Sequence, residues 1–358
     1  MLDIYKLDTQ EGIEKYNSLL ANFDIIEPYF LIDAIDVFGE GYENLMFFLY
    51  ENTQTGAFIF MPGYLKPVII RDEETPYFDF TTPYGYTGPY FSKEVVEIDI
   101  IEFWNNVDTW YRNNNVVCEF IRFNLSNNHL HYSGICKKTM LNIKGKILDE
   151  ETQWSSFDRK VRKNVNKAKR EGLYSHIYYE NVKDENIVEF FEIYRSTMVR
   201  TKAKESFFYS IEKFKKFIKE NPLNCAVCTV YFEGTPISSE LVLISKDSIY
   251  SFLGGTNEKY FDKRPNDFLK VELIHWARNN NIQFYILGGG YGFEDGIFKY
   301  KKAFFPNDIV NYYTGRKIID KSVYSGLLEK TNAYRVSKGL LELDIKDESF
   351  FPLYKKMN

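Results

Sequence analysis

The chain has 358 residues, which is long for one ordinary domain and suits two. Hydrophobic residues make up 44% of it, enough to bury sizeable cores. A net charge of −5 argues against a dedicated nucleic-acid binder, which is usually basic overall. The first residues lack the pattern of a secretion signal, and no apolar run approaches the roughly 20 residues that span a bilayer. We therefore expect a cytoplasmic protein without a transmembrane segment.

In chain order, the first half alternates between helical and strand patterns. Residues 9–20 fit a helix, and the apolar runs at 45–50 and 57–61 fit paired strands joined by a turn. Residues 95–113 fit a second helix, and 116–123 fit a buried strand. Strands mixed with helices predict an α/β or α+β layer rather than a helical bundle.

The second half begins near residue 150 with a helix, because apolar residues recur there at helical spacing. These residues are Trp154, Phe157, Val161, Val165 and Ala168. Ser155 is placed to cap this helix, with Asp158 three residues on, and Gly172 is placed to end it.

The remaining elements follow in an order of helices, a strand meander, a helix and a further strand. Helices are predicted at 185–200, 211–219, 266–279 and 296–304, and strands at 224–232, 237–245, 248–253, 284–287 and 309–314. This order resembles the acetyltransferase (GNAT) fold, in which two neighbouring strands splay apart and leave a cleft for an acyl donor. The strands at 248–253 and 284–287 are the candidates. The tail from 320 to 358 is expected to be helical and to fold back on the body.

The most specific stretch lies between Ile286 and Phe304. A strand ends there in Gly288, Gly289 and Gly290, where missing Cβ atoms let a ligand approach the backbone closely. The next helix begins beside them, and its N-terminus would favour an anion or a developing oxyanion. The candidate ligand-binding residues nearby are Tyr291, Asp295 and Lys299. A flexible turn followed by a solvated basic helix is the alternative interpretation.

This stretch resembles a signature of the Fem family of aminoacyltransferases. The family pattern is a Leu-Gly-Gly strand end, an acidic residue, a short helix and Phe-Lys-x-x-Phe, which is Tyr300-Lys301-Lys302-Ala303-Phe304 here. The resemblance implies that Lys301, next to Tyr300, stabilises charge on the reacting carbonyl. It also implies two tandem GNAT-like domains with mixed sheets flanked by helices. We expect an acceptor-side domain at 1–150, a catalytic domain at 151–319 and a tail at 320–358.

Departures from related patterns bear on the donor and the acceptor. Ordinary acetyltransferases hold the pyrophosphate of CoA with a glycine-rich turn before a helix, but Phe261, Lys263 and Pro265 stand at those glycine positions here. Aminoacyl-tRNA is therefore favoured over acyl-CoA as donor, with no permanently bound cofactor. The Arg and Tyr that bind a nucleotide-linked peptide in one Fem branch have no clear match after Met198, so the acceptor stays open.

Two further groups of residues are candidates for substrate binding. A basic helix between 159 and 170 offers Arg159 and Arg162 to phosphates of the acceptor or of the tRNA acceptor end; a solvated helix face is the alternative. A loop resembling the family's Tyr-rich loop offers Asp79, Tyr84 and Tyr86 to an acceptor pocket; a surface loop packed by its own tyrosines is the alternative.

No metal site is expected. Cys225 and Cys228 lie three residues apart in a predicted strand, so their side chains point to opposite faces.

The leading hypothesis is transfer of an aminoacyl or acyl group onto an amine of a cell-wall or surface-polysaccharide precursor that is linked to a lipid or a nucleotide, with peripheral membrane contact. The alternatives are an acyl-CoA-dependent N-acyltransferase acting on an amino sugar, and a non-catalytic Fem-like scaffold.

Overall fold

The computed structural model describes residues 1–23 and 27–358, which form two compact units. Unit 1 contains Met1–Phe23, Phe38–Thr139 and Tyr312–Asn358, and unit 2 contains Met140–Asn311 and the described part of residues 24–37. The units are not contiguous in sequence. The linear bounds at 150 and 319 that we expected are therefore replaced: the tail belongs to unit 1, and a short early segment belongs to unit 2.

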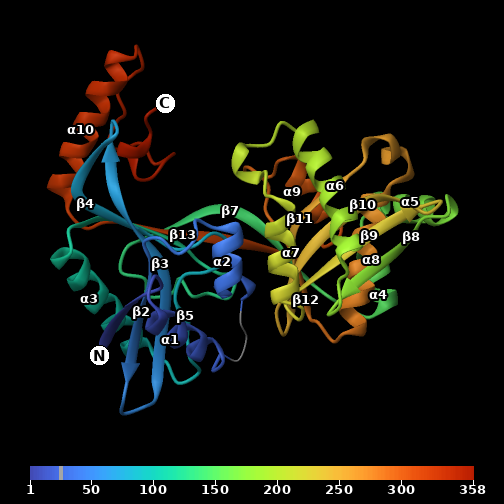
Figure 1. The fold of residues 1–358 in the computed structure, drawn as a ribbon, viewed down its shortest axis with the longest axis horizontal. Helices are drawn as coiled ribbons and strands as arrows, with labels where there is room; N and C mark the ends of the chain where they lie inside the picture. The colour runs from blue at the N-terminus through green and yellow to red at the C-terminus, as the bar shows by residue number, and fades with distance from the viewer. Residues whose placement is uncertain (24–26) are drawn as a thin grey trace. The chain divides into compact units, whose positions relative to one another are not determined.

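Unit 1 is a mixed sheet with helices packed on it (Figure 1). Its strands are β1 (Leu2–Lys6), β2 (Leu45–Asn52), β3 (Ala57–Ile70), β4 (Glu73–Thr81), β5 (Tyr90–Phe91) and β6 (Val116–Arg122), and its helices are α1 (Gln10–Leu20), α3 (Glu97–Asn113) and α10 (Lys321–Ser337). The strand order is β1-β2-β3-β4-β6, followed by β13 (Ile309–Ile318), with β5 beside β3. Only β4 and β6 run parallel among these neighbours, because helix α3 connects them.

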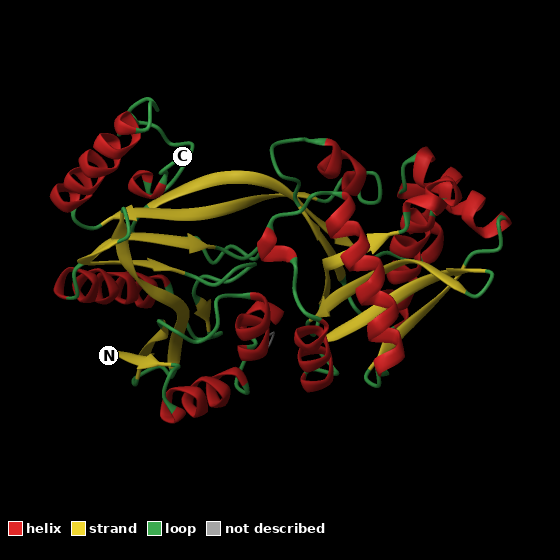
Figure 2. Cartoon of the chain, turned by 45° about the horizontal axis from the view of Figure 1, so that its top comes forward, coloured by secondary structure: helices red, strands yellow, loops and turns green. Residues whose placement is uncertain are grey.

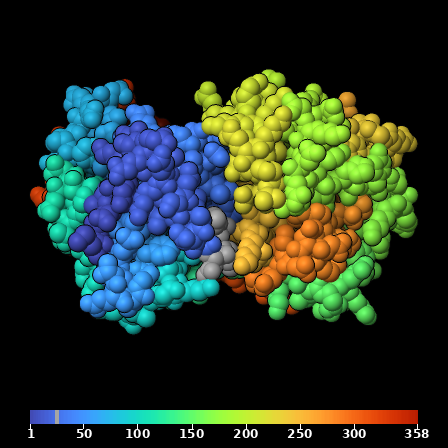
Figure 3. Space-filling model, turned by 60° about the horizontal axis from the view of Figure 1, so that its bottom comes forward, coloured from blue at the N-terminus to red at the C-terminus, as the bar shows by residue number. Residues whose placement is uncertain are grey.

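Both faces of this sheet are covered, which explains why β2 is buried along almost its whole length. Residues of α3, among them Phe103 and Trp104, pack with Phe48 and Phe80 on one side. On the other side, α10 and the 3-10 turn Leu353–Lys355 pack against Val68 and Cys118. Helix α1 buries Tyr16 and Leu19, and its other side forms part of the surface drawn in dark blue in Figure 3.

Unit 2 is a second mixed sheet flanked by helices (Figure 2). Its strands are β8 (Tyr174–Tyr179), β9 (Cys225–Phe232), β10 (Thr235–Ile244), β11 (Ser248–Thr256) and β12 (Phe284–Gly288), joined at one edge by β7 (Ile135–Lys146). Its helices are α2 (Ile32–Phe38, of which Phe38 belongs to unit 1), α4 (Glu150–Ser156), α5 (Arg159–Arg170), α6 (Asp184–Arg200), α7 (Ile211–Glu220), α8 (Pro265–Asn279) and α9 (Gly296–Lys302). The strand order is β7-β12-β11-β10-β9-β8.

The two sheets share one plan. In each, an antiparallel meander leads to a strand that pairs in parallel with the strand after a helix: β4 with β6 in unit 1, and β11 with β12 in unit 2. An antiparallel strand then follows, β13 beside β6 and β7 beside β12. In sequence, β13 begins at the end of the long segment of unit 2 but pairs with β6 of unit 1, and β7 begins at the end of a segment of unit 1 but pairs with β12 of unit 2. This exchange explains why linear domain bounds do not describe the chain.

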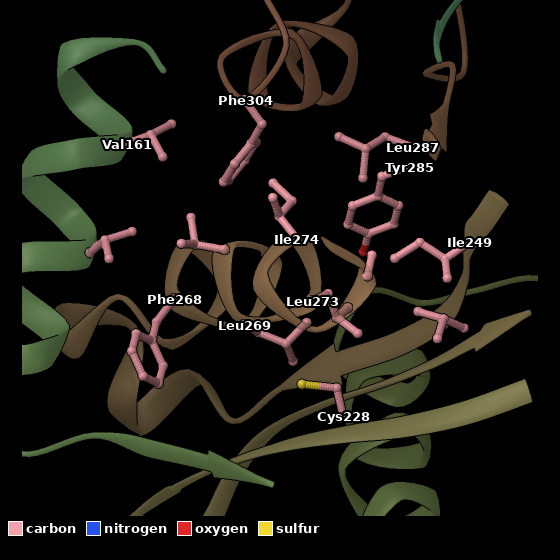
Figure 4. Close-up of a cluster of buried hydrophobic side chains, with 14 of the residues drawn as sticks. Val161, Cys228, Ile249, Phe268, Leu269, Leu273, Ile274, Tyr285, Leu287 and Phe304 are labelled. Carbon is pink, nitrogen blue, oxygen red and sulfur yellow. The ribbon is translucent and has the colours of Figure 1, made fainter. Parts of the chain in front are cut away.

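The core of unit 2 is built around α8, whose residues Leu269, Leu273 and Ile274 pack between α5 and the sheet (Figure 4). Tyr285 reaches into the same cluster from β12. Val161, Val165 and Ala168 supply the buried stripe of α5, as the helical spacing predicts.

Several elements differ from the sequence-based expectation. The helix expected from residue 154 onward is two helices, α4 and α5, because the chain is extended at Phe157 and Asp158. Asp158 rather than Ser155 caps α5, accepting a hydrogen bond from the amide of Lys160 at 2.9 Å. Strands β1, β4, β5, β7 and β8 were not predicted, and the tail is helical only as far as Ser337 before its final 3-10 turn. None of the described helices is long and apolar enough to cross a membrane.

Candidate active site

The splayed strands β11 and β12 mark the candidate site in unit 2. They pair in parallel over three residues, from Ser248 opposite Phe284 to Tyr250 opposite Ile286. Over the same stretch β11 is buried, and from Ser251 to Gly255 it becomes partly exposed. The strands therefore separate where the sequence predicts, and the separation opens the sheet at the end of β12.

The glycine run is required by packing at this point. Gly288 ends β12 with φ +73°, a left-handed conformation that glycine adopts without strain. A Cβ on Gly289 would lie 2.8 Å from the carbonyl oxygen of Leu141, and one on Gly290 would lie 2.0 Å from Oδ1 of Asp295. Packing against Leu141 and Asp295 thus requires glycine at these positions, in addition to the close approach of a ligand that we expected.

Asp295 occupies the backbone amides that follow the glycines. Its carboxylate accepts hydrogen bonds from the amides of Tyr291 at 2.6 Å, Gly292 at 3.2 Å and Phe298 at 2.8 Å. These backbone hydrogen bonds, that of Phe298 foremost, hold the pKa of Asp295 below its usual value. The chain's own carboxylate therefore already binds three of the amides at which we expected an external oxyanion, and that expectation stays a prediction. Tyr291 itself is 90% exposed.

Lys301 lies behind this turn with its ammonium group directed at the strand end. Its Nζ donates a hydrogen bond to the carbonyl oxygen of Gly289 at 2.7 Å. Burial, and secondarily the nearby charge of Lys270, lower the pKa of Lys301 from 10.5 to about 8. The side chain is thus a cation at neutral pH that gives up its proton far more readily than an ordinary lysine. Lys299, two residues earlier, is exposed.

Tyr300 is the second residue that the sequence places in the reaction centre. Its ring packs edge-on against Phe304 at 5.3 Å, and its hydroxyl is buried with no hydrogen-bond partner among the described residues. Burial raises the pKa of Tyr300 well above its usual value, and the negative charges of Asp267 and Glu240 add to the effect. A buried hydroxyl without a partner costs stability, which makes it a candidate for contact with a ligand.

A buried ion pair lies close to these groups and was not predicted. Lys270 on α8 donates to both carboxylate oxygens of Glu240 on β10, at 2.7 and 2.6 Å. It also donates to Oγ of Ser251 at 2.9 Å and to the Tyr285 hydroxyl at 3.2 Å. The sequence signal is a charged residue at an otherwise apolar position, since Lys270 stands between Leu269 and Val271 on the buried face of α8.

The segment before α8 has no open glycine turn. Residues Glu258–Lys263 form a 3-10 helix, and Arg264 has φ +63° before Pro265 begins α8. Asp267, in the first turn of α8, accepts a hydrogen bond from Asn164 at 3.0 Å. This segment therefore presents side chains and a proline where the glycine-rich turn of ordinary acetyltransferases would lie.

The two arginines of the basic helix have different surroundings. Arg162 donates to the carbonyl oxygens of Ser155 at 2.9 Å and of Phe157, and so binds the C-terminal end of α4. Arg159 is exposed, with no partner among the described residues. Arg162 therefore has a structural role, and Arg159 is the better placed of the two for an external phosphate.

The candidates of the first half, Asp79, Tyr84 and Tyr86, lie in unit 1. Asp79 belongs to β4, is buried, and accepts a hydrogen bond from the hydroxyl of Tyr354. Tyr84 is 63% exposed, while the ring of Tyr86 packs edge-on against Tyr312 at 5.7 Å. Asp79 is thus bound to the C-terminal tail, whereas the two tyrosines belong to the loop that follows β4.

Cysteine chemistry does not contribute a site in the described residues. Cys225 and Cys228 are both buried in β9 as free thiols, and burial raises the pKa of both. No group of three His, Cys, Asp or Glu side chains with metal-ligating geometry is found in residues 1–23 and 27–358.

Comparison with known proteins shows which families and structures this chain resembles. Residues 155–302 match the family model of the acetyltransferase (GNAT) domain. These residues form a GNAT-like domain. No curated protein sequence matches the chain. Among solved structures, FemX is similar with a TM-score of 0.57 at 12% identity, covering 78% of this chain and 89% of FemX.

Two further structures share the fold. The C-terminal domain of a putative lysylphosphatidylglycerol synthetase from Agrobacterium fabrum has a TM-score of 0.58 at 12% identity, covering 89% of this chain and 95% of that one. L-PGS from Bacillus licheniformis has a TM-score of 0.55 at 13% identity, covering 92% and 97%. The resemblance to the Fem family is thereby confirmed at the level of the fold, as is the expected class of GNAT-like domains with mixed sheets flanked by helices.

Proposed function

We propose that the chain transfers an aminoacyl or acyl group onto an amine of a cell-wall or surface-polysaccharide precursor. The observation that carries the proposal is the position of Lys301. Its ammonium group is largely buried in a GNAT domain, at the end of β12, and the carbonyl oxygen of Gly289 fixes its direction. A buried cation at the splayed strands is suited to bind an oxygen that becomes negative during acyl transfer.

In the proposed reaction, the acceptor amine attacks the carbonyl carbon of the donor, and the carbonyl oxygen becomes an oxyanion. Lys301 donates a hydrogen bond to that oxygen. A lysine whose pKa is about 8 is a stronger hydrogen-bond donor than one at 10.5. The intermediate then collapses, the bond to the donor's oxygen or sulfur breaks, and the amine's proton goes to that leaving atom. The amides of Tyr291 and Gly292, which donate to Asp295, take no part in this scheme.

An aminoacyl-tRNA is the preferred donor in this proposal, with no permanently bound cofactor. The 3-10 helix Glu258–Lys263 and Pro265 stand where ordinary acetyltransferases cradle the CoA pyrophosphate. Exposed Arg159 is available to the phosphates of a tRNA acceptor end. A putative lysylphosphatidylglycerol synthetase shares the fold, and its name denotes a lysyl conjugate, which supports aminoacyl chemistry as well. The description of the matched domain as an acetyltransferase keeps acetyl-CoA as the alternative donor.

A two-donor assay tests the proposal. The purified chain is incubated with radiolabelled bulk aminoacyl-tRNA or with radiolabelled acetyl-CoA, together with lipid-linked or nucleotide-linked amino-sugar precursors, and label in the acceptor is counted. We expect label from aminoacyl-tRNA with the unmodified chain and with Lys302→Met, and none with Lys301→Met. Label from acetyl-CoA alone would establish the alternative donor. Absence of label from both donors, or full transfer by Lys301→Met, would contradict the proposal.

A further inference from the structure

Unit 1 contains a cavity of about 280 Å³ at the face of its sheet that the C-terminal tail covers. The cavity is lined by Lys66, Asp79, Phe80, Thr81, Cys118, Phe120, Arg122, Phe351, Pro352 and Lys355. All of these residues belong to unit 1, so the cavity is independent of the Lys301 site in unit 2.

Strand register explains why these side chains converge. Lys66 pairs with Asp79 across β3 and β4, and Asp79 pairs with Cys118 across β4 and β6, so the three stand in one row. Phe120 and Arg122 follow Cys118 at intervals of two along β6 and therefore share its face. The tail supplies the opposite wall, where the ring of Phe351 stacks on that of Phe120 at 6.4 Å.

Arg122 is the group in this cavity that lacks a counter-ion. Its Nη1 donates to the carbonyl oxygen of Thr82 at 2.6 Å and to Oγ1 of Thr81 at 3.0 Å. The guanidinium carbon lies 5.0 Å from the centre of the Phe120 ring. In the described part of the chain, no carboxylate lies within ion-pair distance of Arg122, and its Nε and Nη2 have no protein partner. Burial lowers the pKa of Arg122, which shows that the charged form is held at a cost.

The other charges of the cavity do not supply the missing anion. Asp79 accepts a hydrogen bond from the Tyr354 hydroxyl through Oδ1, and its Oδ2 lies 2.5 Å from Nζ of Lys355, so its negative charge is already paired with a lysine of the tail. Lys66 pairs with Glu40, which is 63% exposed and does not line the cavity. The lining therefore holds three cations and one carboxylate, and the carboxylate is bound to the tail.

We propose that this cavity binds a small molecule carrying a carboxylate or a phosphate ester, whose oxygens accept hydrogen bonds from Nε and Nη2 of Arg122. The planar guanidinium offers these two donors in parallel, which suits a two-oxygen contact. Phe351 and Pro352 provide an apolar wall for the rest of the ligand, and Lys355 and Lys66 lie beside the anion. The site takes its ligand whether or not unit 2 transfers an acyl group.

Calorimetric titration of the full chain at constant ionic strength tests this proposal. The probes are phenyl phosphate and benzoate, which distinguish the two anions, with phenol as the uncharged control. We expect saturable binding of at least one anion and none of phenol. Removal of the guanidinium in Arg122→Met is expected to weaken binding by about ten- to a hundredfold, the usual effect of losing hydrogen bonds to a charged group.

Two more variants keep the test decisive, because Arg122 also binds the Thr82 carbonyl and its loss perturbs the strand. Lys355→Ala leaves that hydrogen bond intact and is expected to weaken anion binding about threefold or more. Asp79→Asn removes the only carboxylate of the lining and is expected to tighten binding about threefold or more. The matched control is Lys338→Ala, at the exposed end of α10, with unchanged binding. Absence of saturable anion binding, or equal affinities in all variants, would overturn the proposal, and neither result depends on transfer activity.

Discussion

The buried charge of Lys301 predicts that this residue makes the protein less stable. Its pKa is about 8 in the folded chain, whereas an unperturbed lysine, which stands for the unfolded chain, has a pKa of 10.5. The difference corresponds to about 3 kcal/mol of unfavourable free energy for carrying the proton in the fold. Lys301→Met removes that cost and also loses the hydrogen bond to Gly289, which is about 1 kcal/mol. We therefore expect Lys301→Met to raise the free energy of unfolding by about 2 kcal/mol at pH 7.

The stability difference between the unmodified chain and Lys301→Met depends on pH in a defined direction. At pH 7 both states of the unmodified chain carry the proton, and the full cost is present. Between pH 8 and 10.5 the unfolded chain binds more protons at this position than the folded chain, so the stability of the unmodified chain rises with pH. The advantage of Lys301→Met is therefore largest at pH 7 and close to zero by about pH 9.5.

Urea unfolding of the full chain at pH 7 and 9.5, followed by tryptophan fluorescence, to which Trp154 and Trp276 of unit 2 contribute, measures this difference. Lys302→Met, on the same helix, is the matched control and is expected to change stability by less than about 0.5 kcal/mol at both values. A Lys301→Met variant that is less stable at pH 7, or whose advantage is the same at pH 9.5, would refute the reasoning about the buried ammonium group.

Two further predictions concern the groups around Lys301. Lys270→Met leaves the Glu240 carboxylate buried without its partner and is expected to lower the free energy of unfolding by about 3–5 kcal/mol, while the double variant with Glu240→Leu recovers most of the loss. A double variant as unstable as the single one would contradict this. Tyr300→Phe removes a buried hydroxyl without a partner and is expected to raise stability by about 1 kcal/mol in thermal melts. If transfer falls at the same time, the hydroxyl contacts substrate; a loss of stability would show that it has a partner in the fold.

Parts of the core of unit 2 could be predicted from the sequence, because the patterns that indicate them lie within single helices and strands. The apolar spacing of Val161 and Val165 predicted a buried helix face, and a strand running into Gly288 predicted the end of β12. The predicted separation of the strands at 248–253 and 284–287 is also present in the structure.

What the sequence missed depends on contacts between distant residues. The pairing of Lys270 with Glu240 joins residues 30 positions apart, and that of Asp79 with Tyr354 joins residues 275 apart. The hydrogen bonds from the amides of Tyr291 and Phe298 to Asp295 were also not predicted, because the sequence does not show how the turn folds around that carboxylate. The pairing of β7 with β12 and of β13 with β6 could likewise not be predicted, because the sequence pattern of a strand does not show which sheet the strand joins.

The most direct test of the central claim is the pH dependence of transfer, measured as kcat/KM for the unmodified chain and for Lys301→Arg over pH 6.5 to 9.5. Dividing kcat/KM of the unmodified chain by kcat/KM of Lys301→Arg cancels the titration of the acceptor amine, which is the same in both reactions. If the Lys301 ammonium binds the oxyanion, this ratio falls as pH rises through about 8, because lysine loses its proton there while arginine stays charged. A ratio that is constant across the range, or that rises through pH 8, would contradict the claim.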